Sequence, residues 1–239
     1  MAALAAAVLA GALTQRISGI GFALVAAPVL ILLLGPVQGV VVTNVFAVLT
    51  ALSVYIRHAR DVEYRKILPL LLAACVAAVP CALLTRDLPA DVLAVIAGCL
   101  VLGALALSVT AQRVRGIAGR PGLIAAGALS GAMNVAAGVG GPAVAAYAVA
   151  ARWPHDRFAL SVQFYFVVLG VWSLLVRGVP PALTPTEWAV AVLALAAGLW
   201  VGSAASRRVG VRAARRWCLV VAFLGALGVV AQGVLGLAA

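Results

Sequence analysis

The sequence predicts an all-α polytopic membrane protein built from two homologous repeats of opposite orientation. Three observations lead to this prediction: an apolar composition, a series of apolar blocks of spanning length, and two over-long blocks that are each broken by glycine. Of the 239 residues, 66% are hydrophobic and only 10% are charged, and the mean hydropathy is +1.20. A soluble domain carries about 25% charged residues, so lipid must be the main solvent of this chain.

The apolar blocks have the character of helices rather than of strands in an outer-membrane barrel. They show no period-2 alternation, and they are rich in Leu, Ala and Val, which suits segments whose backbone hydrogen bonds are all internal. A spanning helix needs about 20 residues. Six blocks have this length: Val37–Ile56, Ile67–Leu84, Val92–Thr110, Phe158–Val176, Trp188–Ser206 and Trp217–Leu237.

Two further blocks, Met1–Leu34 and Gly122–Ala151, are too long for one straight crossing. At 1.5 Å per residue each would extend for roughly 45–50 Å, which exceeds the hydrocarbon thickness even with tilt. A glycine-containing interruption lies near the middle of each block, at Gln15–Gly21 and at Asn134–Pro142. Because glycine and proline end helical geometry, we expect each block to contain two half-helices joined by an unwound stretch, either discontinuous or re-entrant.

The two halves of the chain match each other weakly. The glycine pair 19/21 corresponds to the pair 138/140, and the run 43–46 corresponds to 162–165, both at an offset of 119 residues. Each half is therefore expected to hold one broken helix pair followed by three ordinary spans. Glycine-interrupted segments at equivalent positions are typical of a transporter's binding site. The first repeat, a cytoplasmic linker and the second repeat are expected at residues 1–112, 113–121 and 122–239.

The charged loops favour one topology. If both broken blocks crossed the membrane, the Lys and Arg of the loops, all but Arg16, would be divided equally, eight to each side, and would give no orientation. If each block instead returns to its own side as a re-entrant hairpin, 14 lie inside and only Arg86 and Arg177 lie outside. That distribution obeys the positive-inside rule. We therefore favour six crossings, two hairpins and both termini outside, with eight crossings as the alternative.

The composition also excludes several functions. The net charge of +11 does not predict nucleic-acid binding, because the basic residues lie at the ends of apolar blocks, where they orient the protein. No acidic residue and no histidine falls inside an expected span, so we expect no catalytic set, no metal and no cofactor, and the chain is not expected to be an enzyme. An intramembrane enzyme, or a structural subunit without transport activity, is the alternative. The sequence carries no signal of oligomeric state.

Arg16 lies between apolar runs at the break of the first long block. A charged side chain inside a membrane is costly and commonly faces a protein cavity, and a guanidinium binds oxyanions through paired hydrogen bonds. Helix N-termini also attract anions. These features predict a binding site for a small anion; the alternative is that Arg16 is an interfacial anchor whose side chain extends to the headgroups.

The predicted site combines both breaks with one amide from a neighbouring span of each half. The second break lacks the Lys-Ser/Thr of a P-loop, so a nucleotide is not expected. Close helix packing through glycine, and interhelical bonding by single amides, are the alternative roles. The predicted substrate-binding residues are Arg16, Gln15, Thr14, Ser18, Gly19, Gly21, Asn44, Asn134, Gly138, Gly140, Gly141 and Gln163.

The motifs at the two breaks resemble those of a known family. The run Gly19-Ile20-Gly21-Phe22, followed by Pro28 and then Thr43-Asn44, resembles the first-repeat signature of the TauE/SafE sulfite-exporter family, and Gly138-Val139-Gly140-Gly141-Pro142 resembles its second-repeat motif. The resemblance covers almost the whole chain. It implies a plasma-membrane transporter of small anions, chiefly sulfite, sulfonates and related sulfur compounds. The first break departs from the commoner Gly-x-Gly-Gly-Gly form, because Phe22 and Ala23 follow Gly21.

Overall fold

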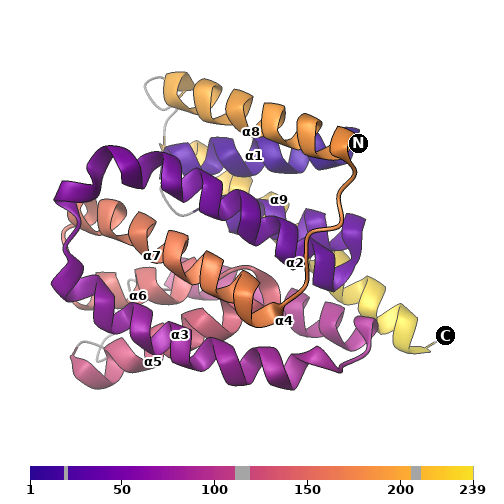
Figure 1. The fold of residues 1–239 in the computed structure, drawn as a ribbon, viewed down its shortest axis with the longest axis horizontal. Helices are drawn as coiled ribbons and strands as arrows, with labels where there is room; N and C mark the ends of the chain where they lie inside the picture. The colour runs from indigo at the N-terminus through magenta and orange to yellow at the C-terminus, as the bar shows by residue number, and fades with distance from the viewer. Residues whose placement is uncertain (19–20, 111–118, 206–210, 239) are drawn as a thin grey trace.

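Every secondary-structure element in the described part of the chain is helical (Figure 1). The structure, a computed structural model, describes residues 1–18, 21–110, 119–205 and 211–238, and the side chains of 17–18, 204–205 and 211–218 lie outside that description. In chain order the elements are α1 (Ala2–Ser18), α2 (Phe22–His58), the 3-10 helix η1 (Ala59–Asp61), α3 (Tyr64–Arg86), α4 (Ala90–Thr110), α5 (Arg120–Ala137), α6 (Gly141–Ala150), α7 (His155–Arg177), α8 (Pro185–Ala205) and α9 (Val211–Ala238).

The described residues include six helical segments that are long and apolar enough to cross a membrane. Each overlaps one of the six expected blocks, although Ser206, the expected end of the fifth, lies outside the described residues. The expectation of a polytopic α-helical membrane protein is therefore confirmed. The six segments are Phe22–Asp61, Tyr64–Arg86, Ala90–Thr110, His155–Arg177, Pro185–Ser203 and Leu219–Ala238.

The first over-long block folds back on itself as a helical hairpin. Its first arm is α1, and its second arm is the opening part of α2, residues 22–34. Gly11 of α1 lies against Phe22 and Ala26, since a Cβ added at Gly11 would be 2.9 Å from the Phe22 ring. The buried apolar cluster between the arms continues to Leu30. The two arms are antiparallel neighbours, so the chain returns to the end of the bundle at which it began.

A second sharp turn follows at Gly35, inside α2. Gly35 has φ 80° and ψ 167°, a backbone conformation that favours glycine, and the next residue is Pro36, which has no N–H to donate. The chain then runs back beside the arm it has just completed. A Cβ added at Gly39 would lie only 2.5 Å from the Ile31 Cα, eight residues earlier. Residues 36–58 form the long crossing that follows.

The second over-long block, α5 and α6, forms the other hairpin. The first arm ends at Gly138, which has φ 73° and donates its N–H to the Asn134 carbonyl at 2.9 Å, a common way for glycine to end a helix. Across the hairpin, Ser130 Oγ donates to the Gly140 carbonyl at 2.7 Å. Both over-long blocks therefore consist of two helices joined at a glycine-containing break, as the sequence predicts.

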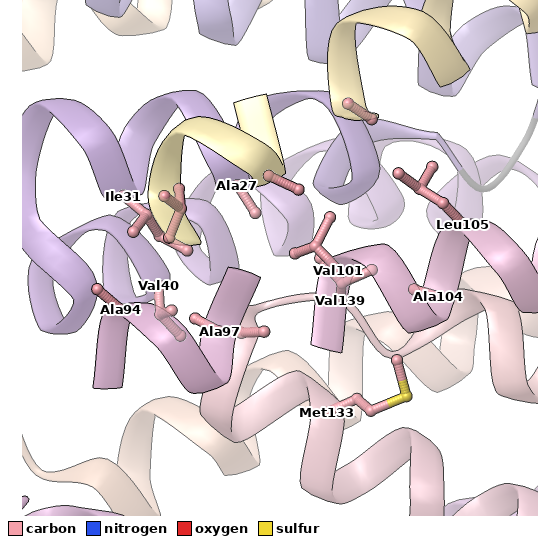
Figure 2. Close-up of a cluster of buried hydrophobic side chains, with 14 residues drawn as sticks. Ala27, Ile31, Val40, Ala94, Ala97, Val101, Ala104, Leu105, Met133 and Val139 are labelled. Carbon is pink, nitrogen blue, oxygen red and sulfur yellow. The ribbon is translucent and has the colours of Figure 1, made fainter. Parts of the chain in front are cut away.

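Small residues bring the helices of the bundle close together. α3 packs on α5, α4 on α9, α1 on α8 and α2 on α7. A Cβ added at Gly131 of α5 would overlap the Ala74 carbonyl of α3, and one at Gly98 of α4 would meet the Val230 side chain of α9. Such close approach matters in lipid, where burying apolar surface gives helices little reason to associate. Figure 2 shows one buried cluster formed in this way, with Val101 of α4 beside Val139 at the second break.

Contacts of the loops with one another and with nearby helix ends define the two ends of the bundle. At one end Trp153 Nε1 donates to the Glu63 carboxylate, and the Glu63 N–H donates to Ser161 Oγ at 3.0 Å. We call this the basic end. At the other end, the terminal end, Gln38 Nε2 donates to the Pro180 carbonyl at 3.2 Å, and the start of α1 and the end of α9 both lie on this side (Figure 1). The segments that follow α2 and α6 therefore meet at the same end of the molecule.

Replacing Gly131 by alanine should destabilise the bundle, because the added Cβ would meet the Ala74 carbonyl at the α3–α5 contact. Overpacking of this kind costs about 1–3 kcal/mol, which should appear as a lower melting temperature of the purified protein in detergent. Gly103→Ala is the matched control: this helical glycine is exposed, and an added Cβ would meet nothing within 4 Å. Equal melting temperatures for the two variants would contradict the packing described here.

Candidate functional site

A small pocket lies where the tips of the two hairpins meet. It is bounded by the ends of both breaks, by the long crossing of α2 and by α7. Six of the twelve predicted site residues line it: Gln15, Asn44, Asn134, Gly138, Gly140 and Gly141. The other lining residues are Phe22, Ala23, Leu24, Ala47, Val139, Pro142 and Phe166. Residues from four separate segments of the chain, more than 100 positions apart in places, thus surround one cavity.

Gln15 ties the first hairpin to α7. Its side chain is buried, with 6% exposed, and its Nε2 donates to Gln163 Oε1 at 3.1 Å. Its Oε1 accepts the N–H of Phe22 at 3.1 Å. That N–H opens the second arm and finds no acceptor within its own helix. One amide therefore closes the break and also fixes the hairpin tip against a spanning helix.

Asn134 makes the corresponding connection for the second hairpin. Its Nδ2 donates to Asn44 Oδ1 at 2.9 Å and to Ser173 Oγ at 2.8 Å, so both of its amide hydrogens are used. Asn44 in turn donates from Nδ2 to the Val40 carbonyl at 3.1 Å. The side chains of Asn44, Asn134 and Ser173 are all buried. Their mutual hydrogen bonds hold each amide in one orientation at the pocket wall.

The two amide pairs occupy equivalent places in the sequence. Asn134 lies 119 positions after Gln15, and Gln163 lies 119 positions after Asn44. In each pair, an amide near the end of a hairpin's first arm donates to an amide on the long helix of the other half of the chain. Two lining residues, Ala47 and Phe166, show the same spacing. The pocket therefore lies between residues of the two halves that share a spacing of 119 positions in the sequence.

The remaining predicted residues near the breaks take other positions. Thr14 is buried, and its hydroxyl donates at 2.8 Å to the carbonyl one turn earlier in α1. Gly21 immediately precedes α2 as its N-cap residue. Gln163 does not line the pocket but reaches it through its bond to Gln15. Gly19 lies outside the described residues, and so does the side chain of Ser18, the last residue of α1.

Arg16 lies on a different face of α1 from Gln15 and is not among the pocket-lining residues. A Cβ added at Gly202 of α8 would be 2.8 Å from the Arg16 Cβ, so the aliphatic stem of this arginine packs on α8. Gly202 is in the last turn of α8, toward the basic end of the bundle. The position fits the interfacial role that long basic side chains often have. Arg16 nevertheless directly follows the pocket-lining residue Gln15 in the sequence.

The pocket offers neutral hydrogen-bond donors and no charged side chain among its lining residues. Ala23 and Leu24 belong to the first turn of α2, and Gly141 opens α6. N–H groups in a first turn have no acceptor in their own helix, and the helix start carries partial positive charge. No cluster of three or more His, Cys, Asp or Glu occurs in the described part of the chain. Unpaired N–H groups at helix starts are suited to a small anion.

Several hydrogen bonds around the second hairpin were not predicted. Tyr165 donates its hydroxyl to Ser130 Oγ at 2.7 Å, Ser173 accepts from Asn134, and the Arg177 guanidinium donates to the Val135 carbonyl. Tyr165, Ser173 and Arg177 are separated by eight and four residues and so share one face of α7. That spacing was the available sequence signal, but only the fold shows that the face meets α5.

Comparison with known proteins identifies one match. The family model described as "Sulfite exporter TauE/SafE" matches residues 3–229, a range that includes both hairpins and the pocket. No match was found among curated proteins or among solved structures.

The Asn44–Asn134 hydrogen bond should appear as an energetic coupling. In a double-mutant cycle, the variant with both Asn44→Ala and Asn134→Ala should lose less stability than the two single variants lose in sum. The difference, the coupling energy, should be about 0.5–2 kcal/mol. The free energy of unfolding in mixed detergent micelles measures it. Thr85→Ala is the control partner for Asn44→Ala, because the Thr85 hydroxyl bonds only to carbonyls of α3 itself in the described structure. If the effects of Asn44→Ala and Asn134→Ala on stability are additive, the hydrogen bond between the two residues is refuted.

Proposed function

The chain belongs to the sulfite exporter TauE/SafE family, and from that premise we propose that it is a secondary transporter or exporter of small anions. The proposed substrates are sulfite, organosulfonates and related sulfur oxyanions. The protein is a multi-pass membrane protein, and its proposed location is the inner or plasma membrane of the cell.

The observation that carries the proposal is the meeting of two helix breaks at one pocket. A broken helix in a membrane is tolerated where it is buried in protein or lines a cavity, and two such breaks at equivalent positions support a transport site. The proposed anion ligands are the N–H groups at the starts of α2 and α6, with Gln15 and Asn134 fixing the pocket wall. Arg16 is proposed to add electrostatic attraction from the neighbouring face of α1.

We further propose that residues 1–112 and 122–239 are inverted repeats joined by the linker 113–121, of which 113–118 lie outside the described residues. The helix contacts support this arrangement. α1 packs on α8, and its equivalent α5 packs on α3, the equivalent of α8. α2 meets α7 and α4 meets α9, so each of these contacts joins two equivalent helices. These four contacts are unchanged when the halves are exchanged, as expected of repeats related by a pseudo-two-fold axis.

A contact between two connecting segments supports six crossings with two re-entrant hairpins. In an eight-crossing topology the segments that follow α2 and α6 would lie on opposite sides of the membrane. In the structure Trp153 of one segment donates to Glu63 of the other. With the basic end in the cytoplasm, an anion that leaves the cell moves down an inside-negative potential and gains about 2.3 kcal/mol per 100 mV for each charge.

Purified protein in proteoliposomes should move sulfite faster than empty liposomes do. Gln15→Leu should lower that flux by about tenfold, because the Phe22 N–H loses its acceptor and Gln163 Oε1 loses the donor that Gln15 supplies, a loss of about 1–3 kcal/mol. Arg16→Ala should lower the flux less, and Arg120→Ala, at the exposed start of α5, should leave it unchanged. If none of sulfite, sulfoacetate, taurine and thiosulfate moves above the level of empty liposomes, the proposed function is wrong.

Single cysteines placed in a variant without native cysteines should report the topology. Asp61→Cys and Ala151→Cys lie at exposed positions of the basic end, and Asp87→Cys lies at an exposed position of the terminal end. A membrane-impermeant maleimide added to intact cells should label Asp87→Cys alone, and the other two should react only after lysis. If Ala151→Cys is labelled in intact cells, as Asp87→Cys is expected to be, eight crossings would be favoured instead.

A further inference from the structure

We propose that Arg177 is a positioning residue that holds the tip of the second hairpin and thereby sets the shape of the pocket. The Arg177 guanidinium, carried by the last turn of α7, donates to the main-chain carbonyl of Val135 in α5. Val135 lies between Asn134, a pocket-lining residue, and the break at Gly138. The contact thus acts on the backbone from which one wall of the pocket is built.

The carbonyls at the end of α5 explain why a cation is needed there. In the last turn of a helix the C=O groups have no N–H partner in the helix itself and carry partial negative charge. The Asn134 carbonyl accepts the N–H of Gly138 at 2.9 Å, which leaves Val135 as the next carbonyl in the chain. A guanidinium meets both requirements, since it supplies a donor and a positive charge.

The location of Arg177 is unusual for an arginine in this chain. It lies at the terminal end, the side expected to be outside, where the positive-inside rule disfavours basic residues. Arg86 is the other arginine expected on that side, and it is exposed in the last turn of α3. Arg177 is instead partly buried against α5. A structural task that an exposed arginine does not have explains why a basic residue lies at this end against the charge bias.

Two other side chains on the same face of α7 act on the same arm. Tyr165 donates to Ser130, whose hydroxyl in turn donates to the Gly140 carbonyl across the hairpin. Ser173 accepts from Asn134 at 2.8 Å. Arg177 adds the last of these hydrogen bonds, at the point nearest the break. Without it the tip would be held by Ser130, Asn134 and the turn at Gly138, and the N–H groups at the start of α6 would be held less firmly.

The consequence for transport rests on the proposed function. A looser tip lowers the fraction of molecules whose pocket is ready to bind, and the apparent affinity falls by that fraction. Arg177→Met should therefore raise the sulfite concentration that gives half-maximal flux, by roughly tenfold, the usual effect of losing a hydrogen bond to a charged group. The maximal flux should change much less. Arg177→Lys should recover part of the affinity, because an ammonium can donate to the same carbonyl.

The experiment measures sulfite flux against concentration in proteoliposomes, together with hydrogen–deuterium exchange of residues 133–141 in detergent. Arg86→Met is the matched control, since it removes an arginine from the same end. We expect a raised half-maximal concentration and faster exchange in Arg177→Met alone. Unchanged values in Arg177→Met would overturn the positioning role.

Two further outcomes are distinguishable. If the wild-type protein moves no sulfite, the proposed function fails, while the exchange measurement still decides whether Arg177 holds the tip. If Arg177→Met cannot be recovered folded, Arg177→Gln, which keeps one neutral donor, is measured in the same way. A failure of every Arg177 variant to fold would also overturn the inference, because Arg177 would then determine folding rather than the shape of the pocket.

Discussion

A helix that breaks inside a lipid bilayer leaves backbone N–H and C=O groups that water cannot satisfy, and the rest of this structure depends on how those groups are satisfied. At the first break the Phe22 N–H is taken by Gln15. At the second, the Gly138 N–H returns to the Asn134 carbonyl, and the Val135 carbonyl receives Arg177. Arg177 comes from a distant helix, and Gln15 is itself held by Gln163 on that same helix, α7. The breaks can therefore persist only in the assembled bundle, so hairpins, long helices and pocket form together.

Each of the two amide pairs connects one hairpin to a long helix in the other half of the chain. Gln15 of the first hairpin bonds to Gln163 on α7, and Asn134 of the second bonds to Asn44 on α2. Any movement of one half against the other must strain or exchange these bonds, because each bridges the two halves. Hydrogen bonds between side chains of neighbouring helices in lipid are individually weak, averaging about 0.6 kcal/mol. They can thus specify one arrangement without preventing its replacement by another, as a transporter requires.

Much of this organisation could be predicted from the sequence. The over-long blocks and their glycines located both breaks, and the offset of 119 identified Asn44 and Gln163 as equivalent amides. The direction of each side chain could not be predicted. Consecutive residues on a helix are about 100° apart, so Gln15 faces the pocket while Arg16 packs on α8. The bonds from α7 to α5 were also out of reach, because they depend on which helices become neighbours, and no local pattern encodes that choice.

Arg16 and Arg177 are related in a way that a search for identical residues could not detect. Arg16 lies 119 positions before Val135, the residue whose carbonyl Arg177 contacts. The first arm of each hairpin therefore ends beside an arginine: α1 carries one in its own last turn, and α5 receives one from α7. A positive charge at a helix C-terminus is stabilising, and the need is the same in both arms. Both hairpin tips thus have an arginine beside the end of the first arm, although the two arginines come from different elements.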